Sequence, residues 1–261
     1  MAKTIFITGA TDGIGLETAK RLAADGHKLL LHGRSPAKLQ AAQTEVSPEA
    51  ETYLADLSSL PQTLELADAI RARHSHIDVL INNAGVYRTP QPLTADGLDV
   101  RFVVNTVSPY LLTKTLWPLF AHEGRIVNLA SAAQAPVDPE ALAGRKRLSD
   151  MEAYAQSKLA LMIWTRALAA DHPEGPSVVS VNPGSLLATK MVKEGFGVEG
   201  SDLGIGADVL RRAALSEEFT GHSGDYFDND AGDFGHPHPD ALDARKTGVV
   251  MKALNALVKA A

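Results

Sequence analysis

Thr8-Gly9-Ala10-Thr11-Asp12-Gly13-Ile14-Gly15 is the stretch that decides the fold of this 261-residue chain. It joins an apolar run, Thr4–Thr8, to a segment with helical character, Ile14–Asp25. Its glycines are spaced G-x-x-x-G-x-G, whereas the more general dinucleotide pattern is G-x-G-x-x-G. Glycines at such a junction let the backbone turn tightly and approach a pyrophosphate, which binds the N–H groups of the helix N-terminus. The stretch therefore predicts a dinucleotide site, with a plain glycine turn as the alternative.

Short apolar runs alternate with helical stretches along the rest of the chain. Strands are expected at Thr4–Thr8, Lys28–His32, Glu51–Leu54, Asp78–Asn82, Arg125–Leu129, Ser177–Asn182 and Asp225–Phe227. Helices are expected at Ile14–Asp25, Pro36–Val46, Pro61–His74, Leu98–Phe120, Met151–Asp171 and Ala207–Leu215. Continuous apolar strands are typical of a sheet that is covered on both faces. The sequence predicts one α/β domain over residues 1–261, a doubly wound Rossmann-type parallel sheet of about seven strands with helices on both faces.

The composition argues against several classes of protein. Hydrophobic residues make up 45% of the chain, and a net charge of −6 without a basic block argues against nucleic acid as a partner. The absence of cysteine excludes disulfides and thiolate metal sites. His74-Ser75-His76 and His236-Pro237-His238 lack a further ligand at a useful spacing, so we expect no metal. Because we find no charged leader and no apolar run near the ~20 residues of a bilayer span, we expect a cytoplasmic protein with no membrane segment.

The end of the second expected strand bears on the choice of cofactor. An NAD site places Asp or Glu about 20 residues after the glycines, where the carboxylate binds the ribose hydroxyls. No carboxylate occurs from Gly26 to Thr44; Gly33 stands at the expected place and Arg34 follows it. An arginine there can bind a 2′-phosphate and stack on adenine. The sequence therefore predicts NADP(H) over NAD(H), unless Arg34 merely caps a surface turn.

Tyr154 and Lys158 are the candidate acid–base pair. They stand at i and i+4 on an expected helix and so share one face, although a surface pair has the same spacing. Ser131 follows the strand Arg125–Leu129. Reducing a carbonyl needs a proton donor, and a free tyrosine pKa near 10 is too high for efficient exchange at neutral pH. A neighbouring ammonium and the charge of the oxidised nicotinamide would lower that pKa. Lys158 would also hold the nicotinamide ribose, and Ser131 would hydrogen-bond and position the substrate oxygen.

Two long segments, Ala132–Asp150 and Ser185–Asp208, do not fit the alternation. Both follow the carboxyl ends of strands, where open α/β sheets bind ligands. The second carries the apolar residues Leu186, Leu187, Met191, Val192 and Phe196. We expect both to form walls of an apolar substrate cleft, with residues 185–215 as the substrate-loop region. Mobile surface loops are the alternative.

Taken together, these motifs resemble the short-chain dehydrogenase/reductase family, and within it the retinol dehydrogenase-like and WW-domain-oxidoreductase-like branch. The resemblance extends from Thr4 to about Phe227. Its T-G-x-x-x-G-x-G matches Thr8–Gly15, its N-N-A-G matches Asn82–Gly85, its Y-x-x-x-K matches Tyr154 and Lys158, and its serine matches Ser131. The resemblance implies Asn105 as a fourth catalytic residue, which in the family holds a water that links the lysine to solvent. A helix cap or bend is the alternative role for Asn105.

The resemblance also implies a set of cofactor-binding residues. They are Gly9, Thr11, Asp12, Gly13, Ile14, Gly15, Arg34, Asp56, Leu57, Asn83, Ala84, Gly85, Pro183, Gly184 and Thr189. Asp56-Leu57 resembles the pair beside the adenine, and Pro183-Gly184 resembles the turn that faces the nicotinamide. Asp56 could instead be a turn residue, and Asn83 could instead tie off a strand end. Two departures stand out: Ala188 occupies the usual place of the family threonine, one residue before Thr189, and Asp12 stands where some NADP-preferring members have a basic residue.

The predicted function is that of an oxidoreductase that transfers a hydride between NADP(H) and a ketone, aldehyde or secondary alcohol. A cofactor-binding sensor without chemistry is one alternative, although a sensor has no need of four catalytic residues. An epimerase or dehydratase is a less favoured alternative, because such relatives usually carry T-G-x-x-G-x-x-G. The partner is a small molecule, and the resemblance implies a homodimer or homotetramer, although monomers occur in the family.

Overall fold

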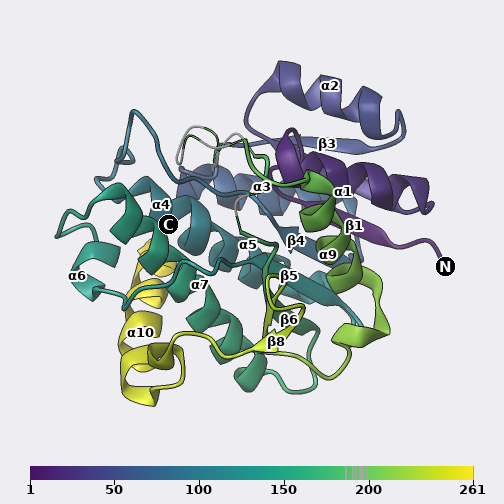
Figure 1. Cartoon of the computed structure of the whole chain (residues 1–261). Helices are drawn as coiled ribbons and strands as arrows, with labels where there is room; N and C mark the ends of the chain where they lie inside the picture. Colours follow the sequence, from purple (N-terminus) through teal and green to yellow (C-terminus); the bar gives the residue numbers. More distant parts are fainter. Residues whose placement is uncertain (186, 190, 192, 194–196, 198, 261) are drawn as a thin grey trace.

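Eight strands form one central sheet in the part of the chain that the structure describes (Figure 1). The computed structural model describes residues 1–185, 187–189, 191, 193, 197 and 199–260. The strands are β1 (Thr4–Ile7), β2 (Lys28–Gly33), β3 (Glu51–Leu54), β4 (Val79–Asn82), β5 (Arg125–Leu129), β6 (Ser177–Asn182), β7 (Tyr226–Asp228) and β8 (Asp233–Gly235). Their order is β3-β2-β1-β4-β5-β6-β7-β8. The order reverses between β1 and β4, which opens a crevice at the carboxyl ends of the strands.

The first seven strands are parallel, so the predicted Rossmann-type sheet is confirmed. Each expected strand forms, with ends that differ by at most one residue. The structure adds β8, which pairs antiparallel with β7 through a short hairpin. Its three residues include a charge and a glycine and show no apolar run, so the sequence pattern does not predict it.

Helices cover both faces of the sheet (Figure 1). They are α1 (Gly13–Ala24), α2 (Pro36–Val46), α3 (Leu60–Arg73), α4 (Val100–Phe102), α5 (Ser108–Leu116), α6 (Pro139–Leu142), α7 (Asp150–Asp171), α9 (Leu203–Leu215) and α10 (Ala244–Ala260). Within the described ranges, no helix combines the length and the hydropathy that crossing a membrane requires.

Two apolar cores result from the alternation of side chains along the strands. In β1, Ile5 and Ile7 pack in the core that α1, α2 and α9 cover, while Phe6 packs in the core that α3, α5 and α7 cover. All three side chains are fully buried. The carboxyl edge of the sheet is thereby held between two packed layers, which fixes the positions of the residues that follow each strand.

The expected long helix Leu98–Phe120 is interrupted by a π-helical turn, Val103–Val107. Pro109 has no N–H and cannot donate to the carbonyl of Asn105 four residues earlier, which removes one α-helical hydrogen bond. Insertions of this kind often lie at functional sites. Here the turn carries Asn105, one of the predicted catalytic residues.

A buried arginine anchors the start of α7, the helix that carries Tyr154 and Lys158. Arg101 is only 2% exposed, and it donates to the Asp99 carboxylate from Nε over 2.8 Å and from Nη2 over 2.6 Å. Its Nη1 donates to Asp150, the first residue of α7. Burial alone would lower the pKa of Arg101, but the bonds to Asp99 and Asp150 outweigh burial and raise it. The guanidinium therefore stays charged and ties α4 to α7.

Replacing Arg101 by methionine leaves the Asp99 and Asp150 carboxylates without their cation. We expect Arg101→Met to lower the free energy of unfolding in urea by about 3 kcal/mol. The matched control is Arg145→Met, which removes an exposed ion pair with Glu140 and should cost less than about 1 kcal/mol. Equal losses in the two variants would contradict a structural role for the buried cluster.

Candidate active site

The glycine-rich loop follows β1 at the point where the strand order reverses. Gly9 and Gly13 have φ of 65° and 55°, values in the left-handed region that favours glycine. A β-carbon at Gly9 would lie 2.9 Å from Ala84 Cα, and one at Gly15 would collide with the Asn83 side chain. The glycines are thus required for the loop to approach the segment after β4. The same loop begins α1, whose first N–H groups have no partner within the helix.

Asn83 joins this loop to the end of β4. Its Nδ2 donates to the carbonyls of Thr8 over 2.8 Å and Gly9 over 3.0 Å. In return, Thr8 Oγ1 accepts the backbone N–H groups of Asn83 and Ala84. The observed bonds of Asn83 are therefore those of a residue that ties two strand ends together. Asn82 points the other way, and its amide donates to Thr113 and Asn128.

His32 is a residue of this site that the sequence reasoning missed. It is 3% exposed at the end of β2; its Nδ1 accepts the Gly9 N–H over 3.2 Å, and its Nε2 donates to the Ala55 carbonyl over 3.1 Å. Burial lowers the pKa of His32 to about 4, so the ring is neutral at physiological pH and holds one tautomer. The sequence signal was present: a single histidine inside an apolar strand needs two polar partners when it is buried.

The end of β2 has no room for an acidic side chain at Gly33. A β-carbon there would collide with Thr11 Cγ2. Arg34 follows and is exposed. The Asp12 carboxylate accepts the Gly13 N–H over 2.9 Å, which caps α1, and it also pairs with Lys38 Nζ at 2.9 Å. The Asp12 carboxylate is thus already engaged by the Gly13 N–H and by the Lys38 ammonium.

Asp56 and Leu57 lie after β3, as predicted. The Asp56 carboxylate accepts the Ser58 N–H over 2.9 Å, so it has the turn role that the sequence left open as an alternative. Leu57 is 4% exposed and its carbonyl accepts the Ser108 hydroxyl over 2.7 Å.

Ser131, Tyr154 and Lys158 come together at the carboxyl end of β5. The Ser131 hydroxyl lies close enough to the Tyr154 phenol to lower the pKa of that phenol. Lys158 Nζ lies 5.7 Å from the centre of the Tyr154 ring and donates to the Leu129 carbonyl over 2.7 Å. Lys158 is 4% exposed. The predicted trio therefore converges, with a phenol between a hydroxyl and an ammonium.

The electrostatics of the trio differ from the sequence-based expectation. Burial is the largest influence on Tyr154 and raises its pKa; the nearby Ser131 hydroxyl offsets this only in part, and Tyr87 raises the pKa further. The Tyr87 and Tyr154 rings meet edge to face, 5.3 Å apart. Burial lowers the pKa of Lys158 to about 8. Without the cofactor, burial thus outweighs any effect of the lysine on the tyrosine pKa, and the expected lowering by lysine and oxidised nicotinamide together stays a prediction.

Asn105 faces the same group from the π-helical turn. Its Oδ1 accepts the Val86 N–H over 2.8 Å, and its Nδ2 donates to the Val86 carbonyl and to Ser157 Oγ, both over 3.0 Å. A β-carbon on Gly85 would lie 3.5 Å from Asn105 Oδ1 and 3.7 Å from Lys158 Nζ. The Asn105 amide thus holds the segment after β4 in place next to Lys158.

The segment after β6 turns back over the glycine-rich loop. A β-carbon on Gly13 would lie 3.9 Å from Thr189 Cγ2, so Thr189 lies beside the loop. Leu187 is 3% exposed. Of the predicted cleft residues, Leu186, Val192 and Phe196 lie outside the described residues. The later part of region 185–215 is α9, which packs on α1.

The other predicted cleft wall, Ala132–Asp150, contains α6 and is held by hydrogen bonds and an ion pair. The Asp138 N–H donates to Gln156 on α7 over 2.9 Å, and Lys146 Nζ pairs with the Asp138 carboxylate at 2.8 Å. The Gln134 side chain donates to the Ser131 carbonyl and accepts the His238 N–H. These contacts hold the segment close to Ser131.

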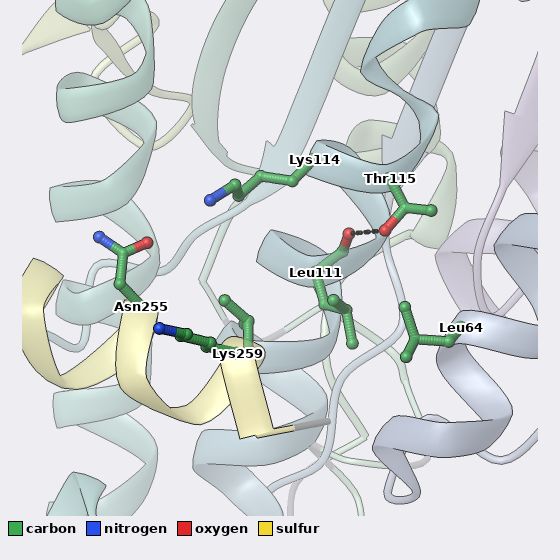
Figure 2. A pocket seen from close by; sticks show the side chains of 7 residues that line it. Leu64, Leu111, Lys114, Thr115, Asn255 and Lys259 are labelled. Atoms are coloured by element: carbon green, nitrogen blue, oxygen red, sulfur yellow. Dashed lines mark hydrogen bonds between the residues drawn. The ribbon is translucent and has the colours of Figure 1, made fainter.

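A separate hollow of about 540 Å³ lies between α3, α5 and α10. Figure 2 shows Lys114 and Lys259 at its rim, with Leu111 and Leu64 on its apolar side. None of the residues that line it belongs to the predicted site. In the described residues, no three metal-ligating side chains gather in one place.

Comparisons with known proteins agree with these features. A family model described as short chain dehydrogenase matches residues 3–197. The chain is 32% identical to Retinol dehydrogenase 13 of Homo sapiens over 253 residues, which cover 87% of this chain and 76% of that protein. It is 31% identical to the WW domain-containing oxidoreductase of Drosophila melanogaster, over 87% of this chain and 62% of that protein. A crystal structure of an uncharacterized protein from Mycobacterium paratuberculosis is similar with a TM-score of 0.82 and 26% identity, over 98% of this chain and 93% of that one.

The buried lysine gives a prediction for stability against pH. The pKa of Lys158 is about 8 in the folded protein and 10.5 at its ordinary value, so between these pH values the unfolded chain binds more protons. Stability therefore rises with pH across that window. We compare the free energies of unfolding of the wild type and of Lys158→Met, measured in urea. From about pH 8 to pH 10.5 the wild type should become more stable relative to the variant by roughly 3 kcal/mol. Below about pH 8 the difference between the two proteins should not change with pH.

The control for this prediction is Lys252→Met, which removes an exposed lysine from α10. A wild-type advantage over Lys158→Met that stays flat as the pH rises through the window would contradict the burial effect.

Proposed function

The chain belongs to the short-chain dehydrogenase family, in its retinol dehydrogenase-like branch, and it is an oxidoreductase of that family; we propose that it transfers a hydride between NADP(H) and a carbonyl or alcohol. The proposed catalytic residues are Ser131, Tyr154, Lys158 and Asn105. The observation that carries the proposal is that Ser131 and Lys158 both lie close to Tyr154, at the carboxyl end of β5.

The loop and its surroundings fit a dinucleotide. Gly9 and Gly13 adopt positive φ, and the start of α1 presents N–H groups that suit a pyrophosphate. Thr189 would close over the pyrophosphate from the other side, and Pro183-Gly184 would face the nicotinamide. When bound, the cofactor supplies or accepts the hydride.

The side chains supply the proton and the orientation. In carbonyl reduction, Tyr154 Oη donates a proton to the substrate oxygen as negative charge develops there. Burial raises the pKa of Tyr154 in the protein without cofactor, so the phenol is protonated at neutral pH; the charge of Lys158 and of the oxidised nicotinamide would lower that pKa for proton exchange. Ser131 Oγ hydrogen-bonds the same oxygen and positions it. Lys158 contributes positive charge when a phenolate forms, and Asn105 holds the neighbouring segment in place.

The cofactor preference rests on the end of β2. Gly33 has no space for a carboxylate-bearing side chain, and Arg34 is exposed beside it. A guanidinium in this position suits a 2′-phosphate, which binds in a bidentate manner. Asp12 is not positioned as a simple repulsive charge, because its carboxylate already caps α1 and pairs with Lys38. We therefore favour NADP(H) over NAD(H).

The proposed substrate is an apolar alcohol or carbonyl compound. The Tyr87 ring, 6% exposed, packs against Tyr154 and supplies an apolar wall beside the phenol. Leu187 is buried in the region that the sequence assigned to the substrate. The name of the relative Retinol dehydrogenase 13 refers to such an apolar alcohol.

Tyr154→Phe tests the role of the phenol. It removes the proton donor and keeps the ring, so we expect kcat for carbonyl reduction to fall by about 10² to 10⁴-fold while NADPH still binds. The measurement is NADPH consumption over a panel of carbonyl compounds, with a binding titration alongside. The control Tyr53→Phe removes a phenol from β3 and should leave kcat unchanged. Retained turnover in Tyr154→Phe would remove the tyrosine from the mechanism, and tight NADPH binding by a wild type that reduces nothing would favour a sensor.

Arg34→Ala tests the cofactor preference. We expect kcat/KM for NADPH to fall by about 10- to 100-fold, because a charge-assisted bond to the 2′-phosphate is lost, and kcat/KM for NADH to change little. Arg71→Ala removes an exposed arginine from α3 and serves as the control. A wild type that uses NADH as well as NADPH would overturn the assignment.

A further inference from the structure

The hairpin between β7 and β8 reaches the turn that follows β6. β7 is the neighbour of β6 in the sheet, with Asn182 opposite Asp228. The four residues that follow, Asn229–Gly232, form the tip of the hairpin, and Asn229 and Asp230 come first. Phe234 of β8 packs against the Phe219 and Phe227 rings at the edge of the core. The contacts of the tip show what else the hairpin holds.

Asp230 accepts three hydrogen bonds from the end of β6 and the turn after it. Its Oδ1 accepts the Ser185 N–H over 2.8 Å, and its Oδ2 accepts the Ser185 hydroxyl over 2.5 Å. Asn182 Nδ2 donates to the same Oδ2 over 2.9 Å and to Asp228 over 2.8 Å. Burial would raise the pKa of Asp230, but the bonds from Ser185 and Asn182 outweigh it and lower the pKa. The carboxylate is therefore ionised, and both of its oxygens are used.

Asn229 holds the middle of the same turn. Its Nδ2 donates to the Pro183 carbonyl over 3.0 Å, and its N–H donates to the Asn182 carbonyl over 3.2 Å. Gly184 has φ of 121°, and a β-carbon there would lie 3.8 Å from the Asn229 amide. The turn thus has a backbone shape that is costly for other residues, and it is bonded to the hairpin at both of its ends.

We propose that the tip of this hairpin is a clamp for the nicotinamide half of the cofactor site, and that Asp230 is its positioning residue. The inference rests on the proposed function, in which Pro183-Gly184 faces the nicotinamide. Asp230 acts through Ser185 and Asn182, and touches neither cofactor nor substrate. By fixing the turn, it also fixes the start of the segment that carries Thr189 to the glycine-rich loop.

The test compares two ligands that share an adenine half. NADPH contains the nicotinamide, whereas 2′,5′-ADP contains only the adenosine part with its 2′-phosphate. We expect Asp230→Ala and Asp230→Asn to raise the Kd for NADPH about tenfold, as measured by calorimetry, and to leave the Kd for 2′,5′-ADP unchanged. The asparagine variant places an NH₂ group among three donors, so it breaks the clamp at nearly constant volume.

Asp233→Asn is the matched control, since it changes an exposed aspartate of the same hairpin whose carboxylate accepts the neighbouring Phe234 N–H. Amide hydrogen exchange without ligand gives an independent readout: the Ser185 N–H should exchange faster in Asp230→Asn than in Asp233→Asn.

An unchanged NADPH affinity in the Asp230 variants would overturn the clamp and leave the proposed function standing. Equal weakening of both ligands would also overturn it, because that pattern marks a general loss of structure. A wild type that binds NADPH no better than 2′,5′-ADP would remove the proposed function and the clamp together.

Discussion

The hydrogen bonds of Asn83 to the Thr8 and Gly9 carbonyls are the constraint on which the rest of the structure depends. They join the ends of β1 and β4, the two strands between which the sheet order reverses. A crevice at this place exists in any doubly wound sheet, but its shape depends on how closely the two strand ends approach. The missing β-carbons of Gly9 and Gly15 allow that approach, and His32 braces Gly9 from the side of β2. The Asn83 amide and the His32 imidazole thus hold the glycine-rich loop in the position that it has in the site.

Burial, more than charge pairing, governs the titration of the buried groups of the site. It raises the pKa of Tyr154, lowers that of Lys158 to about 8 and lowers that of His32 to about 4. The three shifts favour neutral forms, as a low-dielectric site requires. A positively charged nicotinamide ring would add to the charge of Lys158, which is still mainly protonated at neutral pH. Tyr154 therefore keeps its proton until it transfers that proton to the substrate oxygen and becomes a phenolate.

The sequence predicted the parts of the molecule that depend on local patterns. The first seven strands were found from apolar runs, and the meeting of Tyr154 with Lys158 from helical spacing. β8 was missed because its formation depends on pairing with β7. The interruption of the long helix was also missed, although Pro109 is a sequence signal for it. The roles of His32 and Asp230 could not be read from spacing, because their partners lie 23 and 45 or more residues away in the chain. Such long-range pairs depend on the fold itself.

A crystal structure of the protein with NADP⁺ would test the central claim most directly. We predict that the nicotinamide ring lies at the carboxyl edge of the sheet between Tyr154 and the Pro183-Gly184 turn, with the 2′-phosphate within hydrogen-bonding distance of Arg34. A dinucleotide bound with its nicotinamide away from Tyr154, or bound outside the glycine-rich loop, would contradict the mechanism proposed for this site.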